Sequence, residues 1–517
     1  MKNHGSLLLS LLALVALASG DRARAEGVPR LVVNILVDGL RSDYMEAFAP
    51  LYGEDGLRRL LKEGRVYEHA TLPMASADRA AAAATLATGA PPADHGVIAL
   101  RWLDRATLRP VSCTSDEQFG QSAARLATTT VGDELKVASS GRSLVYSIAP
   151  WADAAILTAG HAADAALWLD DESGRWTTTP YYGSLPAWAA VRNASAARLT
   201  ADLSHLEWRP SNDLVGEFSY FLSGGMSKPF AHKFKGAGAL EKFRQSGLVN
   251  EEVAAMAEEA VRQSMLGADA VPDLLGVTFY AGAFQGKSAS MEVQDTYVRL
   301  DRAVARLLGA VEAKVGRQNA LFVFSSTGTS DEEAVSLEQY RIPTGIFDLT
   351  RAVSLLNMYL TALYGPGQYV EGAYERQIYL NHKLLEDRQL AIGEVLDRSV
   401  DLLLGLSGVK DVYTSRRLLQ GAWTPEIGNV RGGYHAARSG DILLQIAPGW
   451  HYVHADYRTD RLQREAYLPF PIILYGMQVI PSVLGETVTT DYIAPTLSAA
   501  MRIRAPNAAA RAPLRLQ

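Results

Sequence analysis

The sequence predicts an α/β protein with a mostly parallel central sheet sandwiched by helices. The first observation is the segment Leu31–Asp38, in which six of the first seven residues are apolar and four of those are Val or Ile. Such a run is typical of a strand buried on both faces, as in a parallel sheet. Similar runs occur at 274–280, 320–324 and 470–475, and a long amphipathic helical pattern ending near Lys314 precedes the third of these four runs.

Residues 1–25 have the pattern of a cleavable secretory signal peptide. Lys2 gives a short basic start, residues 7–18 form an apolar run too short to cross a membrane, and Ala23 and Ala25 provide small residues before a cut after Ala25. No cysteine follows the apolar run, and no later stretch approaches the length of a transmembrane helix. We therefore expect an exported protein, periplasmic or secreted.

Composition narrows the function classes. The net charge is -6 with both signs interspersed, so nothing indicates nucleic-acid binding. Cys113 is the only cysteine, which excludes an internal disulfide and a cysteine-based metal cluster. Residues 26–517 are enough for one large α/β domain, in which we expect cap insertions at about 170–270 and 330–440.

The first predicted strand ends at Asp38-Gly39. A carboxylate at the carboxyl end of a central parallel strand lies where open α/β sheets build their sites. Gly39 allows the chain to turn sharply there. The same two residues equally fit a strand followed by a turn aspartate without a chemical role.

Two helices are predicted before the second buried strand. The first covers 56–63, with its leucines on one face. The second contains the alanine run 80–84, a strong helix former, for which Ser76 or Asp78 could provide the cap. Gly89 ends this helix, and the two prolines that follow forbid its continuation.

Five segments, taken together and in this order, resemble the alkaline phosphatase superfamily. Within it they resemble the type I phosphodiesterase/nucleotide pyrophosphatase branch, and most closely the PafA-like periplasmic alkaline phosphatases. The resemblance covers almost the whole mature chain and implies an alkaline-phosphatase-like fold. The segments are VDGLRSDY at 37–44 with ATLATGAPPADHGVI at 84–98, Gly160-His161 with 166–168 and 176–182, MEVQDTYVRLDRAVARLL at 291–308, RSGDILLQIAPGW at 438–450 and DYIAPTLSAAMRIRAP at 491–506.

The resemblance also implies a chemistry: phosphoryl transfer by a Ser or Thr nucleophile with two zinc ions held by Asp and His. Most of the matching positions carry other residues. Asp38 is the one retained ligand, and Asp460 could stand in for a late histidine. Arg79 occupies the nucleophile position, with Asp78 and Ser76 nearby. The other ligand positions fall on Tyr280, Phe284, Ser326 and Thr327, and the phosphate-binding Lys and Arg of the PafA-like group map near Trp151 and Asp153.

Two hypotheses follow. One carboxylate cannot hold two divalent ions, because each needs about four ligands. The first hypothesis is therefore a pseudoenzyme without a cofactor, which binds an unknown periplasmic protein or an anionic ligand over Arg79, at the start of a helix. The alternative is an active phosphomonoester or phosphodiester hydrolase with a rebuilt site, in which Asp38, Asp460 and Asp78 surround one zinc ion. A structural role in an envelope assembly is a third option without a motif to support it.

The remaining polar candidates favour structural roles. His95 and His161 lie in segments that we interpret as structural. His451 and His454 have the spacing of a metal-binding pair, but surface or packing roles fit their aromatic loop better. The hydroxyls at 325–327 have no histidine base nearby in sequence, so we expect a loop that hydrogen-bonds its own backbone.

Overall fold

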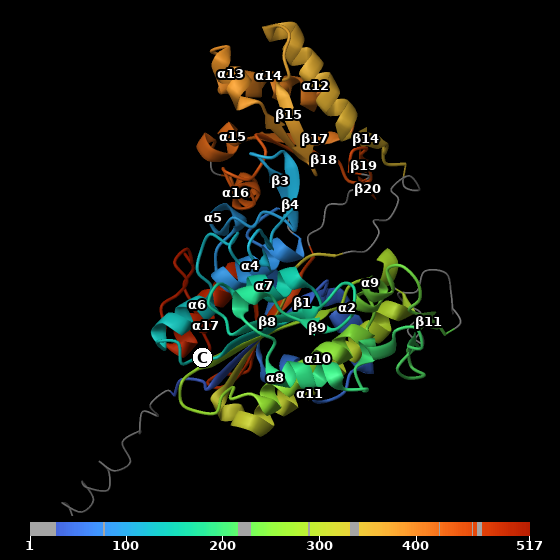
Figure 1. The fold of residues 1–517 in the computed structure, drawn as a ribbon, viewed down its shortest axis with the longest axis vertical. Helices are drawn as coiled ribbons and strands as arrows, with labels where there is room; N and C mark the ends of the chain where they lie inside the picture. Colours follow the sequence, from blue (N-terminus) through green and yellow to red (C-terminus); the bar gives the residue numbers. More distant parts are fainter. Residues whose placement is uncertain are drawn as a thin grey trace, which may run out of the picture.

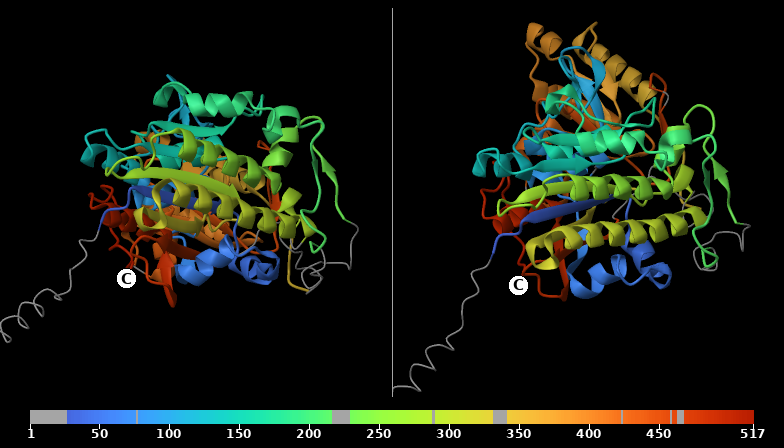
Figure 2. Two further views of the ribbon diagram at one scale, coloured as in Figure 1. Left: turned by 90° about the horizontal axis from the view of Figure 1, so that it is seen from below. Right: turned by 60° about the horizontal axis from the view of Figure 1, so that its bottom comes forward.

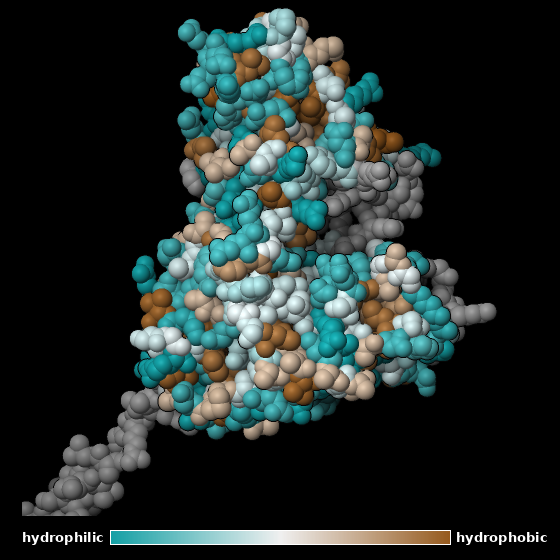
Figure 3. All heavy atoms as spheres, in the orientation of Figure 1, coloured by the Kyte–Doolittle hydropathy of each residue, from teal (hydrophilic) through white to brown (hydrophobic). Residues whose placement is uncertain are grey.

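The computed structural model has two parts, a wide core and a narrower upper lobe that stands on it (Figure 1). The core is built on a nine-stranded sheet, and the upper lobe contains α12 to α16 and β14 to β20. Hydrophilic residues dominate the face seen in Figure 3, and apolar side chains form small separate patches. The structure describes residues 27–75, 78–215, 229–287, 290–330, 341–422, 424–457, 459–462 and 468–517.

The central sheet is mostly parallel, as predicted. Within the described sheet, β21 and β9 run against the other strands, and β13, β1, β12, β7 and β8 form a continuous parallel block. The strands, in spatial order, are β22 (Ser482–Thr489), β2 (Arg65–Thr71), β21 (Phe470–Gly476), β13 (Ala320–Ser326), β1 (Leu31–Asp38), β12 (Asp273–Tyr280), β7 (Val145–Ile148), β8 (Ala165–Leu169) and β9 (Trp176–Thr177).

Helices cover both faces of this sheet (Figure 2). Because side chains alternate along a strand, Val33 and Ile35 of β1 pack into one apolar cluster, and Val32 and Leu36 pack into the other. The first cluster contains residues of α2 (Ser42–Ala47), α3 (Leu57–Glu63), α10 (Leu248–Gln263) and α11 (Met291–Val315), and the second those of α4 (Arg79–Thr88), α6 (Val131–Ala138), α7 (Ala152–Ala159) and α17 (Ile493–Met501).

No helix among the described residues is long and apolar enough to cross a membrane.

Helix α4 begins and ends as its sequence predicts. The Asp78 side chain accepts hydrogen bonds from the backbone N–H groups of Ala80 and Ala81, which makes it the N-cap. Gly89 ends the helix in the left-handed conformation, with φ 68°. All residues from Ala80 to Thr88 are buried, so the small alanines allow α4 to pack closely against its neighbours. The other predicted cap, Ser76, lies outside the described residues.

The first predicted insertion contains two kinds of structure. Helix α10 lies in the helical layer on the sheet, where it packs against α11 and β12. Of the elements before it, α8 and α9 also contact α10, and α9 and β11 lie towards one side of the core (Figure 1). The elements before α10 in this insertion are η2 (Pro180–Tyr182), α8 (Ala187–Ala194), η3 (Leu199–Asp202), β10 (Glu207–Trp208), β11 (His232–Lys233) and α9 (Ala239–Arg244).

The upper lobe covers residues 346–462, so it extends past the second insertion predicted at about 330–440, and it has its own apolar cluster. The β3–β4 hairpin (Arg101–Asp104 and Arg109–Ser112) extends from the core to contact β15. The elements are β14 (Ile346–Asp348), α12 (Leu349–Tyr364), β15 (Val370–Tyr374), β16 (Gln377–Leu380), α13 (His382–Asp387), α14 (Ile392–Leu404), β17 (Val409–Thr414), α15 (Ser415–Gln420), α16 (Pro425–Gly432), β18 (Ile442–Ile446), β19 (His451–His454) and β20 (Thr459–Leu462).

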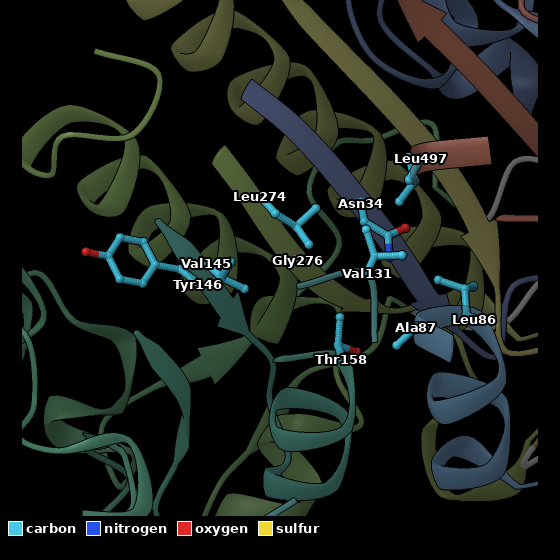
Figure 4. A pocket seen from close by; sticks show the side chains of 10 residues that line it. All are labelled: Asn34, Leu86, Ala87, Val131, Val145, Tyr146, Thr158, Leu274, Gly276 and Leu497. Carbon is cyan, nitrogen blue, oxygen red and sulfur yellow. The ribbon is translucent and has the colours of Figure 1, made fainter. Parts of the chain in front are cut away.

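The core contains a cavity of about 10 Å³ between the sheet and the helices α4, α6 and α7 (Figure 4). Asn34 and Thr158 line it, and Asn34 Oδ1 and Thr158 Oγ1 have no hydrogen-bond partner among the residues that the structure describes. This volume and these two polar atoms suit one buried water molecule. We therefore assign this cavity a structural role.

Candidate functional site

The carboxyl ends of β1 and β13 bring Asp38 together with two threonines. Asp38 Oδ1 accepts hydrogen bonds from Thr327 Oγ1 at 2.8 Å and from Thr329 Oγ1 at 3.2 Å. Thr327 Oγ1 in turn accepts from the backbone N–H of Gly39 at 3.3 Å. Because neighbouring parallel strands end at the same edge of a sheet, the turn after β1 and the loop after β13 meet here.

Arg79, the first residue of α4, joins Asp38 to a second carboxylate. Its Nη1 donates to Asp38 Oδ2 at 3.2 Å. Its Nε and Nη2 donate to the two oxygens of Asp153 at 3.1 and 2.8 Å, which is the bidentate geometry that arginine and carboxylates favour. The guanidinium also stacks 4.1 Å from the ring centroid of Trp151. We call Asp38, Arg79 and Asp153 the ion-pair cluster.

The ion-pair cluster is largely shielded from solvent. The side chains of Arg79, Asp38 and Asp153 are 17%, 10% and 11% exposed. Burial lowers the pKa of Arg79, but the charges of Asp153 and Asp38 outweigh burial and raise this pKa above its usual value. The guanidinium is therefore permanently charged and compensated by two carboxylates.

A third carboxylate lies beside the cluster. Asp78 Oδ1 caps α4, and Asp78 Oδ2 accepts from the backbone N–H of Leu100. Burial raises the pKa of Asp78 to about 6, although these backbone hydrogen bonds act in the opposite direction. With Asp78 ionised, the site contains three carboxylates and one guanidinium, so its net charge is negative.

The other predicted ligand positions are engaged in packing or local hydrogen bonds. Tyr280 is buried, pairs in register with Asp38 and donates its hydroxyl to the Ala283 carbonyl at 3.3 Å. Phe284 is buried and packs its ring 5.2 Å from that of Trp208. Ser326 and Thr327 were predicted to hydrogen-bond the backbone of their own loop, and only some of their hydrogen bonds do so. Ser326 Oγ donates to the Leu40 carbonyl across the sheet and accepts from the N–H of Gly328.

Two predicted site residues are not brought to Asp38 by the described structure. Asp460 lies on β20, where its backbone pairs with Val453, in a three-stranded sheet of the upper lobe rather than in the central sheet. Ser76 lies outside the described residues. Anion binding over Arg79 stays a prediction. In the structure, every donor nitrogen of this guanidinium lies within hydrogen-bond distance of a carboxylate.

These residues do not fit a two-zinc centre. A zinc ion needs about four ligands, and Asp38 is surrounded by two hydroxyls and a guanidinium instead. A fixed positive charge 3.2 Å from Asp38 Oδ2 would also repel a divalent cation. In the part of the chain that the structure describes, no three His, Cys, Asp or Glu side chains gather in a group that could hold a metal ion.

His95 and His161 have structural partners. His95 Nδ1 accepts from the backbone N–H of Val97 at 3.1 Å, and its Nε2 lies 3.0 Å from Thr85 Oγ1. Burial lowers the pKa of His95 to about 3, so the ring is neutral and its Nε2–H donates to Thr85. His161 Nε2 lies 3.2 Å from the Thr128 carbonyl. Both contacts agree with the structural interpretation of the sequence.

A pocket of about 600 Å³ adjoins the ion-pair cluster, between the core and the upper lobe. From the core it is lined by Asp78, Asp153 and residues 98–101. From the upper lobe it is lined by residues 374–377, Tyr413 and residues 443–445. We call it the interlobe pocket. Its volume lies in the range of sites that bind small molecules.

Sequence reasoning placed Arg79 and Asp153 at family positions but did not predict that they pair. The signal was present, because the two positions carry opposite charges and the resemblance assigns both to one site. Thr329 was missed altogether. Its role depends on the path of the loop after β13, which local patterns do not determine.

Known proteins with similar sequences agree with this architecture. The family model of type I phosphodiesterase / nucleotide pyrophosphatase matches residues 32–467. Alkaline phosphatase PafA of Elizabethkingia meningoseptica is 28% identical, with 98% of each chain covered. Alkaline phosphatase PhoV of Synechococcus elongatus is 27% identical, with 93% of this chain and 91% of that protein covered.

A solved structure extends the similarity to the fold. The crystal structure of wild-type PafA superimposes with a TM-score of 0.81 at 26% identity, covering 95% of this chain and 99% of that one. Sequence match and fold therefore agree over both the core and the upper lobe. The chain belongs to the type I phosphodiesterase / nucleotide pyrophosphatase family and has the alkaline-phosphatase-like fold of its PafA-like members.

Proposed function

We propose that this phosphoesterase-family protein has lost two-metal phosphoryl transfer and acts by binding a ligand or a protein partner. The observation that carries the proposal is the ion-pair cluster. At the start of α4, where the family pattern has a Ser or Thr nucleophile, Arg79 contacts Asp38 and Asp153.

The proposal follows from what a guanidinium can and cannot do. It has no lone pair that could attack phosphorus, and it stays protonated at any working pH. Two divalent ions would supply four positive charges to the attacking and leaving oxygens of a phosphate ester. Arg79 supplies one positive charge, and two carboxylates already neutralise it.

The hydroxyls nearest to Asp38 do not replace the nucleophile. Thr327 and Thr329 both donate to the same Asp38 oxygen and lie 2.9 Å from each other. Thr327 is fully buried and also accepts the N–H of Gly39. A substrate phosphate could reach these hydroxyls only by displacing this network.

The proposal includes the location of the protein. The predicted signal peptide would deliver the chain to the periplasm or outside the cell, and the ligand or partner would be found there. The upper lobe and the interlobe pocket are the surfaces that such a ligand would meet.

The test combines metal content with turnover. The purified mature protein would be analysed for zinc and assayed with para-nitrophenyl phosphate, bis-nitrophenyl phosphate and nitrophenyl sulfate, each with and without added zinc. We expect no stoichiometric zinc and no hydrolysis above the rate of buffer.

Zinc at two sites per chain would contradict the proposal. Turnover that Asp38→Ala abolishes would also contradict it and would favour the alternative of a rebuilt single-ion hydrolase. Asp397→Ala is the matched control, because its carboxylate is 69% exposed on α14 of the upper lobe. If both variants retained a trace activity, that activity would come from a contaminant, and the proposal would stand.

A further inference from the structure

We infer that the interlobe pocket takes a ligand with a cationic nitrogen group, an ammonium or a guanidinium, attached to an aromatic or apolar part. This inference rests on the proposed function and names the ligand class of the same site. The inference is based on the charge of the pocket lining. A pocket beside the phosphate position of this family would be expected to attract anions, whereas this pocket is lined by carboxylates.

The floor of the pocket presents carboxylates. Asp78 and Asp153 line the pocket, whereas Arg79 is not part of its lining. The guanidinium lies against Trp151 and between its two carboxylate partners. Each carboxylate oxygen can accept two hydrogen bonds, and Asp153 Oδ2 accepts one, from Arg79 Nη2. The floor therefore retains acceptor capacity and negative charge.

The upper lobe adds aromatic rings and a further carboxylate. Tyr374 and Tyr413 line the pocket, and ring faces attract cations. Tyr413 already packs against one cation, since the Arg417 guanidinium lies 4.5 Å from its ring centroid. Glu375 adds a third carboxylate to the lining.

The charges of the whole lining favour the same ligand. The lining includes three acidic residues, Asp78, Asp153 and Glu375, and two arginines, Arg101 and Arg376. Arg101 is exposed to solvent, where its field is screened, and Arg376 is half-buried. The carboxylate of Asp153 is only 11% exposed, so its charge is less screened than that of Arg101.

A phosphate group would be held poorly here. It would have to lose its hydration next to Asp78 and Asp153, and the nearest buried cation would have to leave its carboxylate partners to bind it. An ammonium placed at the same point gains from both carboxylates. The aromatic or apolar part then accounts for Tyr374, Tyr413 and Ile98 in the lining.

The experiment compares three probes that share one ring and differ in charge: benzylamine, benzyl alcohol and phenyl phosphate. Binding to the full mature protein is measured by calorimetry and ligand-observed NMR at low and high salt. We expect benzylamine to bind one to one and at least about tenfold tighter than benzyl alcohol, with weaker binding at high salt. Phenyl phosphate should show no saturable binding.

Variants tie the affinity to the pocket. Glu375→Gln and Asp153→Asn should each weaken benzylamine about tenfold, as expected for the loss of one nearby opposite charge. Asp397→Asn, an exposed carboxylate of the same lobe, should leave the affinity unchanged. Glu375 does not belong to the ion-pair cluster, so the test remains valid if Asp153→Asn fails to fold.

The results of this experiment test the proposed function and the ligand class separately. Hydrolysis of phenyl phosphate would overturn the proposed function. Tighter binding of phenyl phosphate than of benzylamine, without hydrolysis, would overturn the ligand class and leave the proposed function intact. The same holds if benzylamine binds no better than benzyl alcohol, or if Glu375→Gln changes nothing.

Discussion

Replacing Arg79 by methionine tests whether the ion-pair cluster stabilises the core. Arg79→Met keeps most of the length of the side chain and removes its charge. Asp38 and Asp153, which are 10% and 11% exposed, then face each other without a cation. Removing one partner of a buried ion pair costs about 3–5 kcal/mol. Because the cluster keeps some contact with solvent, we expect the lower end, about 3 kcal/mol.

The measurement is urea unfolding followed by tryptophan fluorescence and circular dichroism. Arg79→Lys should lie between the wild type and Arg79→Met, because an ammonium cannot form the bidentate contact with Asp153. Combining Arg79→Met with Asp153→Asn should recover part of the loss, since one uncompensated charge is removed. The control is Arg306→Met, which breaks a paired contact to Glu258 on the surface of α11 and should cost less than about 1 kcal/mol. If Arg79→Met unfolds within about 0.5 kcal/mol of the wild type, the ion pairs do not stabilise the protein and our reasoning is wrong.

Two further predictions concern the groups around the cluster. The pKa of Asp78 is about 6 in the folded protein against 3.8 for the free side chain, so the folded state binds the extra proton and stability falls as the pH rises from about 4 to about 6. Because Asp78 also faces the interlobe pocket, we expect the free energy of unfolding to fall by only about 1–2 kcal/mol over this pH range. Asp78→Asn should remove this pH dependence when unfolding is measured at several pH values. The same pH dependence in Asp78→Asn would contradict the assignment to Asp78. Thr327→Val removes a donor to Asp38 and an acceptor for Gly39, and should cost about 1–3 kcal/mol in thermal or urea unfolding. Thr329→Val, whose hydroxyl lies 3.2 Å from Asp38, should cost less, and equal costs would refute this ranking of the two contacts.

The central sheet was predictable because its inner strands are mostly apolar. Each residue of β1 is buried and Asn34 is its only polar residue before Asp38, so no exposed face interrupts the run. Edge strands were not predictable in this way. β22 is largely exposed, and its sequence carries no continuous apolar signal. Helix α10 could have been separated from the first insertion, because Val249, Val253, Met256, Ala257 and Ala260 recur at helical spacing and are all buried.

The site was predictable up to the point where tertiary packing decides the contacts. The end of β1 fixed Asp38 at the functional edge of the sheet, and the family pattern placed Arg79 and Thr327 near it. The pairing of Arg79 with Asp153 depends on the packing of α7 beside α4, and their residues are far apart in the sequence. The position of Trp151 under the guanidinium depends on the same packing.

The arginine at the start of α4 supplies the positive charge that the buried carboxylate of Asp38 needs. A positive side chain in the first turn opposes the helix dipole, so Arg79 is unfavourable for the helix taken alone. Asp38, however, is buried and needs a positive partner, because an isolated carboxylate in this position would cost several kcal/mol. One guanidinium satisfies Asp38, Asp153 holds it in place through a bidentate contact, and Asp78 restores a favourable cap. A neutral residue at this position would leave Asp38 and Asp153 without their shared cation. Under the proposed function, the cluster that takes the place of the nucleophile therefore also compensates the buried carboxylate of Asp38, and Asp78 and Asp153 are the carboxylates that the interlobe pocket would present to the cationic ligand inferred above.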